Sequence, residues 1–350
     1  MPSRHNVLSD LHPESPQLNT LQDIAREIEK AHRAVVTAHL RSDGDAIGSL
    51  LAMAHGMETS GIEVRRRNPG GLPSTYAFLP KADRIETVET PGQAMSPTDL
   101  LIVLDCPHPG RMGAMEGALK QADRVIAIDH HPDAEPFGHL NFADPEASSV
   151  GEILVDLFDE LGWVVDRDAA LCLLTSIYTD TGCFCHANTR AKSFEAAARL
   201  MTTGVDVTMM TDALYKSIHP NIMALKSDVL KTLRRVAGGR LAYISITEEM
   251  LSHYEVNSLD LQDFSDIPRS VRGVEVGITF QEIEGGTQTK ASFRSKGNVN
   301  VNDIAALFGG GGHDRAAGAV VPHAMEKAID LIVEGALDHL NGQWSEGGCE

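Results

Sequence analysis

The sequence predicts an α/β protein in which a doubly wound, mainly parallel sheet is followed by a smaller α+β domain. Two fully apolar runs, residues 100–104 and 125–128, suit buried strands and alternate with helical patterns. After Gly238 and Gly239 the pattern changes, because apolar and polar residues then alternate as in strands with one solvated face. These observations predict two domains of different architecture.

The first domain is expected to span residues 18–205, and its elements follow from the spacing of apolar residues. A helix is predicted from Leu18 to about His32, and a helix of small, apolar residues over 46–54. Strand candidates are 34–38, 61–65, 100–104 and 125–128, followed by a helix over 150–161 and another apolar segment over 169–178. The alternation of strands and helices predicts the parallel sheet.

The remaining segments are assigned from composition and pattern. Residues 1–17 are polar and rich in Pro and Ser, which predicts a flexible lead-in. A helical connector is expected over 206–239, a second domain over 240–340 with strands at 241–246, 274–280 and 289–294, and a polar tail over 341–350. The chain of 350 residues is long enough for two domains with proper cores.

Charge and cysteine content exclude several classes of protein. The formal net charge of −19 disfavours binding of long duplex nucleic acid, although a short anionic substrate held by local cations and metals remains compatible with it. The five cysteines form no CxxC pair, which argues against a disulfide framework or a zinc ribbon and favours a reducing cytoplasm. The chain has no signal-peptide pattern and no apolar run long enough to span a membrane, so we expect neither export nor a membrane partner.

Acidic and histidine residues follow four apolar segments of the first domain. Because parallel strands bring their carboxyl ends to one edge of a sheet, we expect six of these side chains to converge: His39, Asp43, Asp45, Asp105, His130 and Asp180. Carboxylates and imidazoles without thiolates suit Mn²⁺ better than a structural zinc ion. Two ions about 3.5–4 Å apart would activate a water and polarise a phosphoryl group.

Each of these residues also has an ordinary structural explanation. A lone aspartate such as Asp105 or Asp180 commonly caps a helix or forms a turn, and a lone histidine such as His39 is commonly a hydrogen-bonded core residue. The spacing His39-x-x-x-Asp43-x-Asp45 is more specific, because it crowds two carboxylates and an imidazole into one short segment.

These motifs resemble those of the DHH phosphoesterase superfamily, in the order expected for it. The resemblance rests on the residues from His39 to Ser49, on Leu104-Asp105, on Asp129-His130-His131 and on Thr179-Asp180-Thr181-Gly182. The second half, with Arg294-Ser295-Lys296, Gly310-Gly311-Gly312-His313 and Arg315-Ala316-Ala317-Gly318, resembles the DHH-associated C-terminal domain. The compact two-domain layout looks most like NrnA-type proteins, which hydrolyse very short RNAs and adenosine 3′,5′-bisphosphate.

The resemblance implies a role for each residue. One Mn²⁺ ion would bind His39, Asp43 and Asp105, and a second would bind Asp45, Asp105, His130 and Asp180, with Mg²⁺ or Co²⁺ as substitutes. Asp129 would support a histidine ligand. His131 would contact the phosphate or donate a proton to the leaving oxygen, unless it only buttresses His130.

The second domain is expected to bind the far end of the substrate across a cleft between the domains. The glycine run could present backbone N–H groups to a phosphate, or it could be a plain flexible turn. Together with the resemblance, the donor chemistry assigns substrate binding to Arg294, Ser295, Gly310, Gly311, Gly312, His313 and Arg315. The expected substrates are short single-stranded RNA, linear dinucleotides such as pApA, and adenosine 3′,5′-bisphosphate.

Other functions remain as alternatives at this stage. The nearest is a cyclic-dinucleotide phosphodiesterase that cleaves cyclic di-AMP, and a non-catalytic nucleotide sensor is another. Inorganic pyrophosphatase shares the motifs of the first domain, a RecJ-type exonuclease would be larger and more basic, and a dehydrogenase would need a Gly-x-Gly-x-x-Gly motif after the first strand. The order of substrate preference, the polarity of cleavage and the oligomeric state, for which a homodimer is one alternative, stay open.

Overall fold

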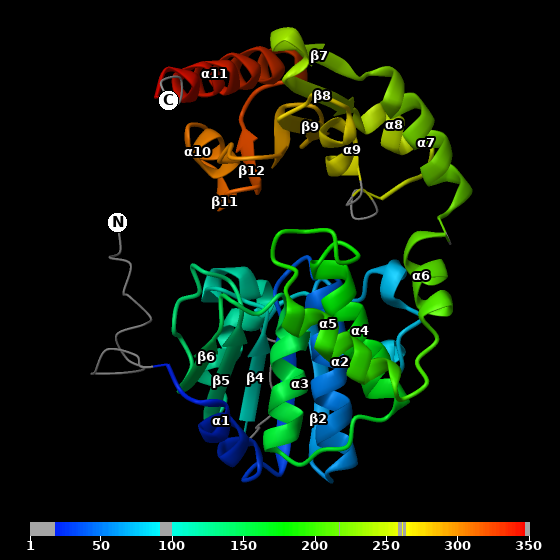
Figure 1. The fold of residues 1–350 in the computed structure, drawn as a ribbon, viewed down its shortest axis with the longest axis vertical. Coiled ribbons are helices and arrows are strands. Elements are labelled where there is room, and N and C mark those ends of the chain that lie inside the picture. Colours follow the sequence, from blue (N-terminus) through cyan, green and yellow to red (C-terminus); the bar gives the residue numbers. More distant parts are fainter. Residues whose placement is uncertain (1–17, 92–99, 217, 258–260, 262–263, 347–350) are drawn as a thin grey trace. The chain divides into compact units, whose positions relative to one another are not determined.

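The computed structural model describes residues 18–91, 100–216, 218–257, 261 and 264–346. The chain forms two compact units, Met1–Ser217 and Ile218–Glu350, coloured blue to green and green to red in Figure 1. The division falls inside the helical connector expected over 206–239. The lead-in expected over 1–17 lies outside the described residues.

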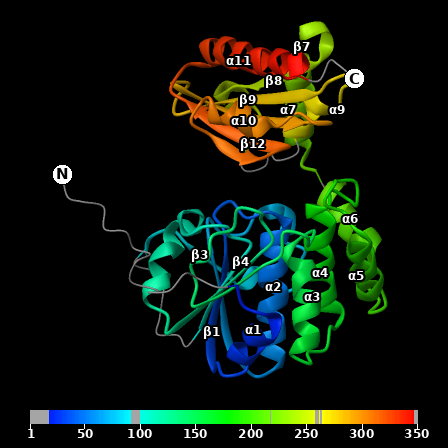
Figure 2. The same cartoon turned by 60° about the vertical axis from the view of Figure 1, so that its left-hand side comes forward.

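The first unit contains a six-stranded sheet in which neighbouring strands are parallel, in the order β3-β2-β1-β4-β5-β6 (Figure 2). The chain leaves β1 in one direction through β2 and β3, and in the other through β4, β5 and β6, so the strand order reverses between β1 and β4. In such sheets ligands bind at the carboxyl ends of the strands beside this reversal. The strands are β1 Arg33–Ala38, β2 Glu63–Pro69, β3 Ile85–Val88, β4 Leu100–Leu104, β5 Arg124–Asp129 and β6 Leu140–Ala143.

Helices cover one face of this sheet, and a 3-10 segment covers the other. Residues of the first face form a core with Ile47, Leu50 and Phe158. Residues of the opposite face form a second core with Met112 and Met115 of the 3-10 segment η5, Pro109–Lys120. The helices of this unit are α1 Leu21–Ile28, α2 Gly44–Thr59, α3 Val150–Glu160, α4 Arg167–Asp180, α5 Ala191–Met201 and α6 Val207–Tyr215, with short 3-10 turns η2 Ser74–Tyr76 and η3 Ala82–Arg84. Both faces are therefore covered, as predicted for a doubly wound sheet.

The apolar segment 169–178 is a helix rather than a strand of the sheet, which corrects the origin of one predicted site residue. It forms most of α4, which begins after Asp166, whose side chain accepts a hydrogen bond from Ala169 N. Every residue of Ala169–Ile177 is buried, since α4 packs against α2, α3 and α5. A helix buried on all sides lacks the polar stripe that separates a helix from a buried strand.

Helices α2 and α4 approach each other closely because small residues line their contact. A Cβ atom added to Gly44 would lie 2.3 Å from Thr179 Oγ1, and one added to Gly48 would lie 2.5 Å from the carbonyl oxygen of Cys172. Only glycine allows backbones to pass at this distance. The contact fixes the start of α2, which carries Asp45, beside the end of α4, which carries Asp180.

The second unit contains a mixed six-stranded sheet in the order β11-β12-β10-β9-β8-β7, where β8 and β9 are parallel and the other pairs antiparallel. Buried residues of the central strands, such as Phe280 and Phe293, form its core with Ile332 of α11. The elements are α7 Pro220–Lys231, β7 Arg234–Val236, η6 Ala237–Gly239, β8 Leu241–Ile246, α8 Glu248–His253, α9 Ile267–Ser270, β9 Val276–Ile283, β10 Gln288–Ser295, α10 Val301–Ala306, β11 Gly311–His313, β12 Ala316–Val321 and α11 Met325–Glu346.

Two features of this unit differ from the sequence-based prediction. Helix α11 continues to Glu346, beyond residue 340 where a polar tail was expected, and residues 347–350 lie outside the described part. The glycine run, predicted as a loop, contributes to a strand, because Gly311 and Gly312 belong to β11. The three strands predicted over 241–294 are confirmed as β8, β9 and β10.

Candidate metal centre

The carboxyl ends of three neighbouring strands place His39, Asp105 and Asp129 in a row. Ala38 pairs with Leu104, and Leu104 pairs with Ile128, so the next residue of each strand lies at the same edge of the sheet. Asp105 has a positive φ of 52°, and its N–H donates to the carbonyl oxygen of Ile128 at 3.1 Å. A non-glycine residue in this conformation costs about 1–3 kcal/mol, and such residues concentrate at functional sites.

One group of ligand atoms combines β1, the start of α2 and β4. It consists of His39, Asp43 and Asp105, whose ligand atoms all lie within 4.8 Å of one another. His39 Nε2 lies 3.3 Å from Asp105 Oδ2 and 4.0 Å from Asp43 Oδ1. His39 Nδ1 lies 2.8 Å from the carbonyl oxygen of Leu40. A hydrogen on Nδ1 would donate to this carbonyl and leave the Nε2 lone pair directed at the carboxylates.

A second group combines the start of α2, the end of β5 and the end of α4. It consists of Asp45, His130 and Asp180, again within 4.8 Å. His130 Nε2 lies 3.5 Å from Asp45 Oδ2 and 3.7 Å from Asp180 Oδ2. His130 Nδ1 faces the carbonyl oxygen of Ala147 at 3.4 Å, so its Nε2 atom is also the one directed at carboxylates.

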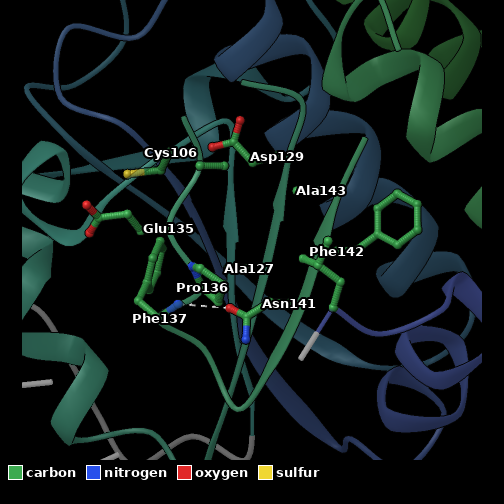
Figure 3. Close-up of a pocket in the computed structure, with 11 residues that line it drawn as sticks. Cys106, Ala127, Asp129, Glu135, Pro136, Phe137, Asn141, Phe142 and Ala143 are labelled. Atoms are coloured by element: carbon green, nitrogen blue, oxygen red, sulfur yellow. Dashed lines mark hydrogen bonds between the residues drawn. The ribbon is translucent and has the colours of Figure 1, made fainter. Parts of the chain in front are cut away.

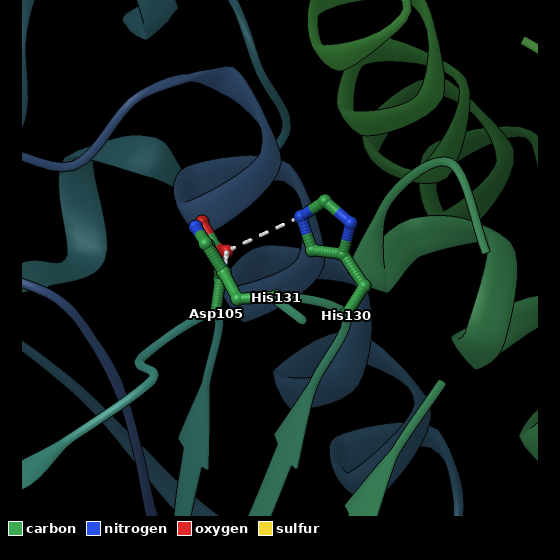
Figure 4. Close-up of side chains that lie close together, drawn as sticks. All are labelled: Asp105, His130 and His131. Atoms are coloured by element: carbon green, nitrogen blue, oxygen red, sulfur yellow. Dashed lines mark ion pairs between the residues drawn. The ribbon is translucent and has the colours of Figure 1, made fainter. Parts of the chain in front are cut away.

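Asp105 faces both groups. Its Oδ2 atom faces His39, and its Oδ1 atom lies 3.7 Å from His130 Nε2 and 3.5 Å from His131 Nδ1 (Figure 4). Asp105 is 2% exposed, and among the described residues its Oδ1 atom has no hydrogen-bond partner. A buried carboxylate oxygen without a donor is costly unless a cation satisfies it.

Asp129 accepts hydrogen bonds from the backbone of the two histidines that follow it, and it contacts the imidazole ring of one of them. Its Oδ1 atom accepts hydrogen bonds from the N–H groups of His130 and His131 and lies 2.7 Å from His131 Nδ1. The contact to the imidazole therefore goes to His131, whereas the ring of His130 is held by Ala147. This arrangement fixes the orientation of His131 and leaves its Nε2 atom as the one that can exchange a proton with a ligand.

Crowding of like charges shifts the pKa values of the carboxyl groups. Burial, and next the negative charge of Asp105, raises the pKa of Asp45. Burial, followed by the charges of Asp45, Asp43 and Asp105, raises the pKa of Asp180 well above its ordinary value. Four carboxyl groups at this distance cannot all be ionised without added positive charge, and a bound cation supplies it.

The histidines supply part of that charge in the metal-free protein. Burial alone would lower the pKa of His39, but its hydrogen bond to Asp105 and the charge of Asp105 outweigh this and raise the pKa to about 8. Burial opposes ionisation of Asp105, yet the hydrogen bond and charge of His39 hold the pKa of Asp105 far below its ordinary value. Divalent cations would replace these protons, so the donor set fits a metal centre without thiolate ligands.

Helix termini hold two of the aspartates, which the sequence did not reveal. Asp45 accepts hydrogen bonds at the start of α3 from Val150 N at 2.8 Å and Gly151 N at 3.2 Å, and from Ser176 Oγ of α4 at 2.5 Å. Asp43 caps α2 by accepting from the N–H groups of Asp45 and Ala46. The capping explanation and the ligand explanation of these aspartates are thus compatible, because a carboxylate has four lone-pair sites.

Ser176 and Asn188 are two contacts of the site that sequence reasoning missed. Ser176 lies one helical turn before Asp180, and a polar residue inside the apolar segment 169–178 was the available signal. Asn188 Nδ2 lies 3.2 Å from Asp180 Oδ2, although Asn188 follows Asp180 by eight positions and carried no signal.

The predicted substrate residues of the second unit occupy different environments. Arg294 of β10 is partly buried, and burial lowers the pKa of its guanidinium group. Ser295 is 1% exposed and its hydroxyl group donates to the carbonyl oxygen of Val299 at 2.7 Å, so it supports the following loop. His313 and Arg315 are exposed at the end of β11 and after it.

Two glycines of the run are required by strand packing. A Cβ atom on Gly310 would lie 2.1 Å from the carbonyl oxygen of Gly318, and one on Gly312 would lie 2.6 Å from that of Ala316. A Cβ atom on Gly311 would lie 3.6 Å from Asn302 Oδ1, an ordinary contact distance. The second half of the run is therefore part of an edge strand rather than a plain flexible turn.

A small pocket lies beside Asp129 on the sheet face covered by η5 (Figure 3). Its wall includes Cys106, Ala127, Phe137 and Asn141, and Phe137 N donates to Asn141 Oδ1. Burial raises the pKa of the Cys106 thiol to about 12, which keeps it protonated. The pocket thus offers no thiolate nucleophile.

Comparison with known proteins agrees with this geometry. Residues 33–177 match the DHH family N-terminal domain, and residues 238–338 match the DHHA1 domain. A Thermus thermophilus protein named bifunctional oligoribonuclease and PAP phosphatase NrnA is 33% identical over 87% of this chain and 89% of its own length. The chain belongs to the NrnA family of DHH phosphoesterases.

Other members and neighbours of the NrnA family extend the match. The Bacillus subtilis protein of the same name is 26% identical over 89% of this chain and 96% of its own length. The crystal structure of an exopolyphosphatase-related protein from Bacteroides fragilis has a TM-score of 0.84 and 26% identity, and covers 91% of this chain and 96% of that one. Among the described residues of this NrnA-family chain, no helix is long and apolar enough to cross a membrane.

Proposed function

We propose that the protein uses two metal ions to hydrolyse short oligoribonucleotides to mononucleotides and adenosine 3′,5′-bisphosphate to AMP. The observation that carries this proposal is a pair of neighbouring ligand groups, His39 with Asp43 and Asp105, and Asp45 with His130 and Asp180, in which Asp105 Oδ1 lies 3.7 Å from His130 Nε2 of the second group. The names of the relatives from Thermus thermophilus and Bacillus subtilis support the substrate classes.

In this proposal His39, Asp43 and Asp105 hold one ion, and Asp45, Asp105, His130 and Asp180 hold the other. Oxygen and imidazole donors without thiolates favour Mn²⁺, with Mg²⁺ or Co²⁺ as substitutes. When bound, two such ions supply Lewis-acid polarisation of a phosphoryl oxygen and lower the pKa of the attacking water. Asp105 contributes to both sites.

His131 acts on the leaving group. Asp129 Oδ1, 2.7 Å from Nδ1, favours the protonated imidazole, and the pKa of His131 is raised: burial opposes this, but the hydrogen bond to Asp129 and nearby carboxylates outweigh it. A protonated His131 can donate from Nε2 to the oxygen that departs from phosphorus. Asp129 keeps the ring in that orientation throughout turnover.

The second unit provides the far end of the substrate site. We propose that His313, Arg315 and the backbone of Gly310, Gly311 and Gly312 bind the terminal phosphate and sugar, with Arg294 contributing its charge and Ser295 holding the adjacent loop. Binding of the far end of the substrate by these residues would favour short substrates. The net charge of −19 agrees with this preference because it repels long nucleic acid.

A product time course in Mn²⁺ tests the proposal. The substrates are pApA, a labelled RNA of about five nucleotides, one of about 24, cyclic di-AMP, adenosine 3′,5′-bisphosphate and pyrophosphate. Asp105→Asn should be inactive, while Asp123→Asn, an exposed aspartate before β5, should behave as the unmodified protein. Turnover of pyrophosphate or cyclic di-AMP alone would contradict the substrate assignment, and no metal-dependent turnover would indicate a nucleotide sensor.

A further inference from the structure

The loop that follows α4 turns back onto the last residue of that helix. The N–H groups of Cys185 and His186 both donate to the carbonyl oxygen of Thr181, at 2.9 and 2.8 Å. The loop then brings the side chain of Asn188 to Asp180. Asn188 Nδ2 lies 3.2 Å from Asp180 Oδ2, 3.2 Å from the carbonyl oxygen of Asp180 and 3.0 Å from the carbonyl oxygen of Ser148.

The surroundings of Asn188 determine which way its amide group points. The three atoms around the Nδ2 position are all acceptors, and an amide oxygen in that place would face three lone pairs. The nitrogen must therefore occupy it, with its two hydrogens shared among the carboxylate of Asp180 and two backbone carbonyls. The amide thus fastens the carboxylate of Asp180 to the chain at Ser148.

Asp180 needs such a donor more than the other aspartates of the site do. It is the last residue of α4, where the helix dipole disfavours a negative charge. Asp43 and Asp45, in contrast, each accept two backbone N–H groups at a helix start. Among the described residues, the Asp180 carboxylate has one hydrogen-bond donor, Asn188 Nδ2.

The anchor of Asn188 is itself rigid. Ser148 lies just before α3, and its hydroxyl group donates to Glu152 Oε2 at 2.6 Å. Ser193 Oγ of α5 donates to the same oxygen at 2.7 Å, and Glu152 is 1% exposed. The start of α3 that binds Asp45 therefore also fixes, through Ser148 and Asn188, the position of Asp180.

We propose that Asn188 is a positioning residue that holds the Asp180 carboxylate in the orientation in which it binds the second metal ion. This inference rests on the proposed function, because Asp180 is a ligand only if the site binds metal. In this role Asn188 acts through the Asp180 carboxylate that it contacts. Loss of its amide donor should weaken the site formed by Asp45, His130 and Asp180 and leave the site formed by His39, Asp43 and Asp105 unchanged.

Metal titration of the full chain tests the inference. Binding of Mn²⁺ is followed by calorimetry and by the electron paramagnetic resonance signal of free Mn²⁺, for the unmodified protein, Asn188→Asp and Asn188→Ala. Asn188→Asp is matched in size but replaces the donor with a negative charge beside Asp180, Asn188→Ala removes the donor without adding charge, and Asn221→Ala on α7 is the control at an asparagine of the second unit. We expect one of two sites to lose affinity about 10–100-fold in both Asn188 variants, the usual effect of removing a group that orients a ligand.

Activity and stability separate positioning from a purely structural role. Excess Mn²⁺ should restore kcat in Asn188→Ala, and the metal-free form of this variant should remain folded in a thermal unfolding experiment. Two sites of unchanged affinity in Asn188→Ala, or both Asn188 variants unfolded without metal, would overturn the role of Asn188 alone. No binding of Mn²⁺ by the unmodified protein would instead overturn the proposed function together with this inference.

Discussion

The two units organise their predicted functional residues in different ways. In the first unit, strand ends and helix ends bring His39, Asp105 and His130 within a few ångströms, although they are far apart in the sequence. In the second unit, the predicted residues lie along β10 and β11, where some are buried and others exposed. The parallel topology gathers side chains at one edge, whereas antiparallel pairing distributes them along strands.

This difference teaches which sequence patterns determine function. A carboxylate after a buried parallel strand has its position set by the fold, because the strand register decides its neighbours. A glycine in or beside an antiparallel edge strand is required first by close packing, as the distances at Gly310 and Gly312 show. Ligand binding by such a glycine has to be separated from packing by experiment.

The largest effect is expected from Asp105, which faces both ligand groups. Asp105→Asn removes the charge that faces His39 and His130, so we expect kcat to fall by at least about 10³-fold, beyond the 10–100-fold typical of a supporting group. Steady-state kinetics in Mn²⁺ measure the loss. Activity within about tenfold of the unmodified protein would contradict the shared role of Asp105.

Substitutions within the glycine run should separate packing from binding. Gly310→Ala places a methyl group 2.1 Å from a carbonyl oxygen, so it should lower the free energy of unfolding by about 1–3 kcal/mol or more. Gly311→Ala meets its nearest atom at 3.6 Å and should leave stability unchanged while raising KM if a phosphate approaches this backbone. Denaturant unfolding and kinetics on pApA distinguish the two. An unchanged KM in Gly311→Ala would show that the glycine run serves packing and does not bind the substrate.

Removal of the exposed donors of the second unit should affect binding rather than chemistry. His313→Ala and Arg315→Ala should each raise KM for pApA about 10-fold with a smaller change in kcat, because a hydrogen bond to a charged group contributes about 1.5–3 kcal/mol. The exposed Arg234→Ala on β7 is a suitable control. Equal KM values for all three variants would place the substrate elsewhere.

The smallest expected effect is the pH dependence of stability without metal. The pKa of His39 is raised from 6.5 to about 8, so between these pH values the folded state keeps a proton that the unfolded state has released. The resulting stabilisation is fully present below pH 6.5 and is lost as the pH rises to about 8. The raised pKa of Asp45 has the same effect, because the stabilisation that it provides decreases as the pH rises above 3.8. We expect a loss on the order of 1–2 kcal/mol across this range in EDTA.

Manganese should reverse that trend. Metal ligands must lose their protons, so the stabilisation by Mn²⁺ should increase as the pH rises through the same range. Thermal unfolding at several pH values, with and without the metal, measures the difference. Equal stabilisation at low and high pH would show that the cation does not displace protons from these groups.

Much of the first unit could be predicted because its signals are local. The strands ending before His39 and Asp105 are short, apolar and sharply bounded, and the parallel topology then dictates their convergence. Helix α4 could not be distinguished from a strand, since burial on every side hides its period. The role of Asn188 depends on how a loop folds back onto a helix end, which residue types and spacing do not encode.

The strand lengths in both sheets have a consequence for solubility. The outermost strands are the shortest of each sheet: four residues in β3 and β6, and three residues in β7 and β11. A long open edge is a template on which another chain can add a strand and begin aggregation. Short edges limit that template, and β11 presents two glycines in its three positions. A short glycine-containing strand at the exposed edge of the sheet therefore does not promote self-association by strand addition.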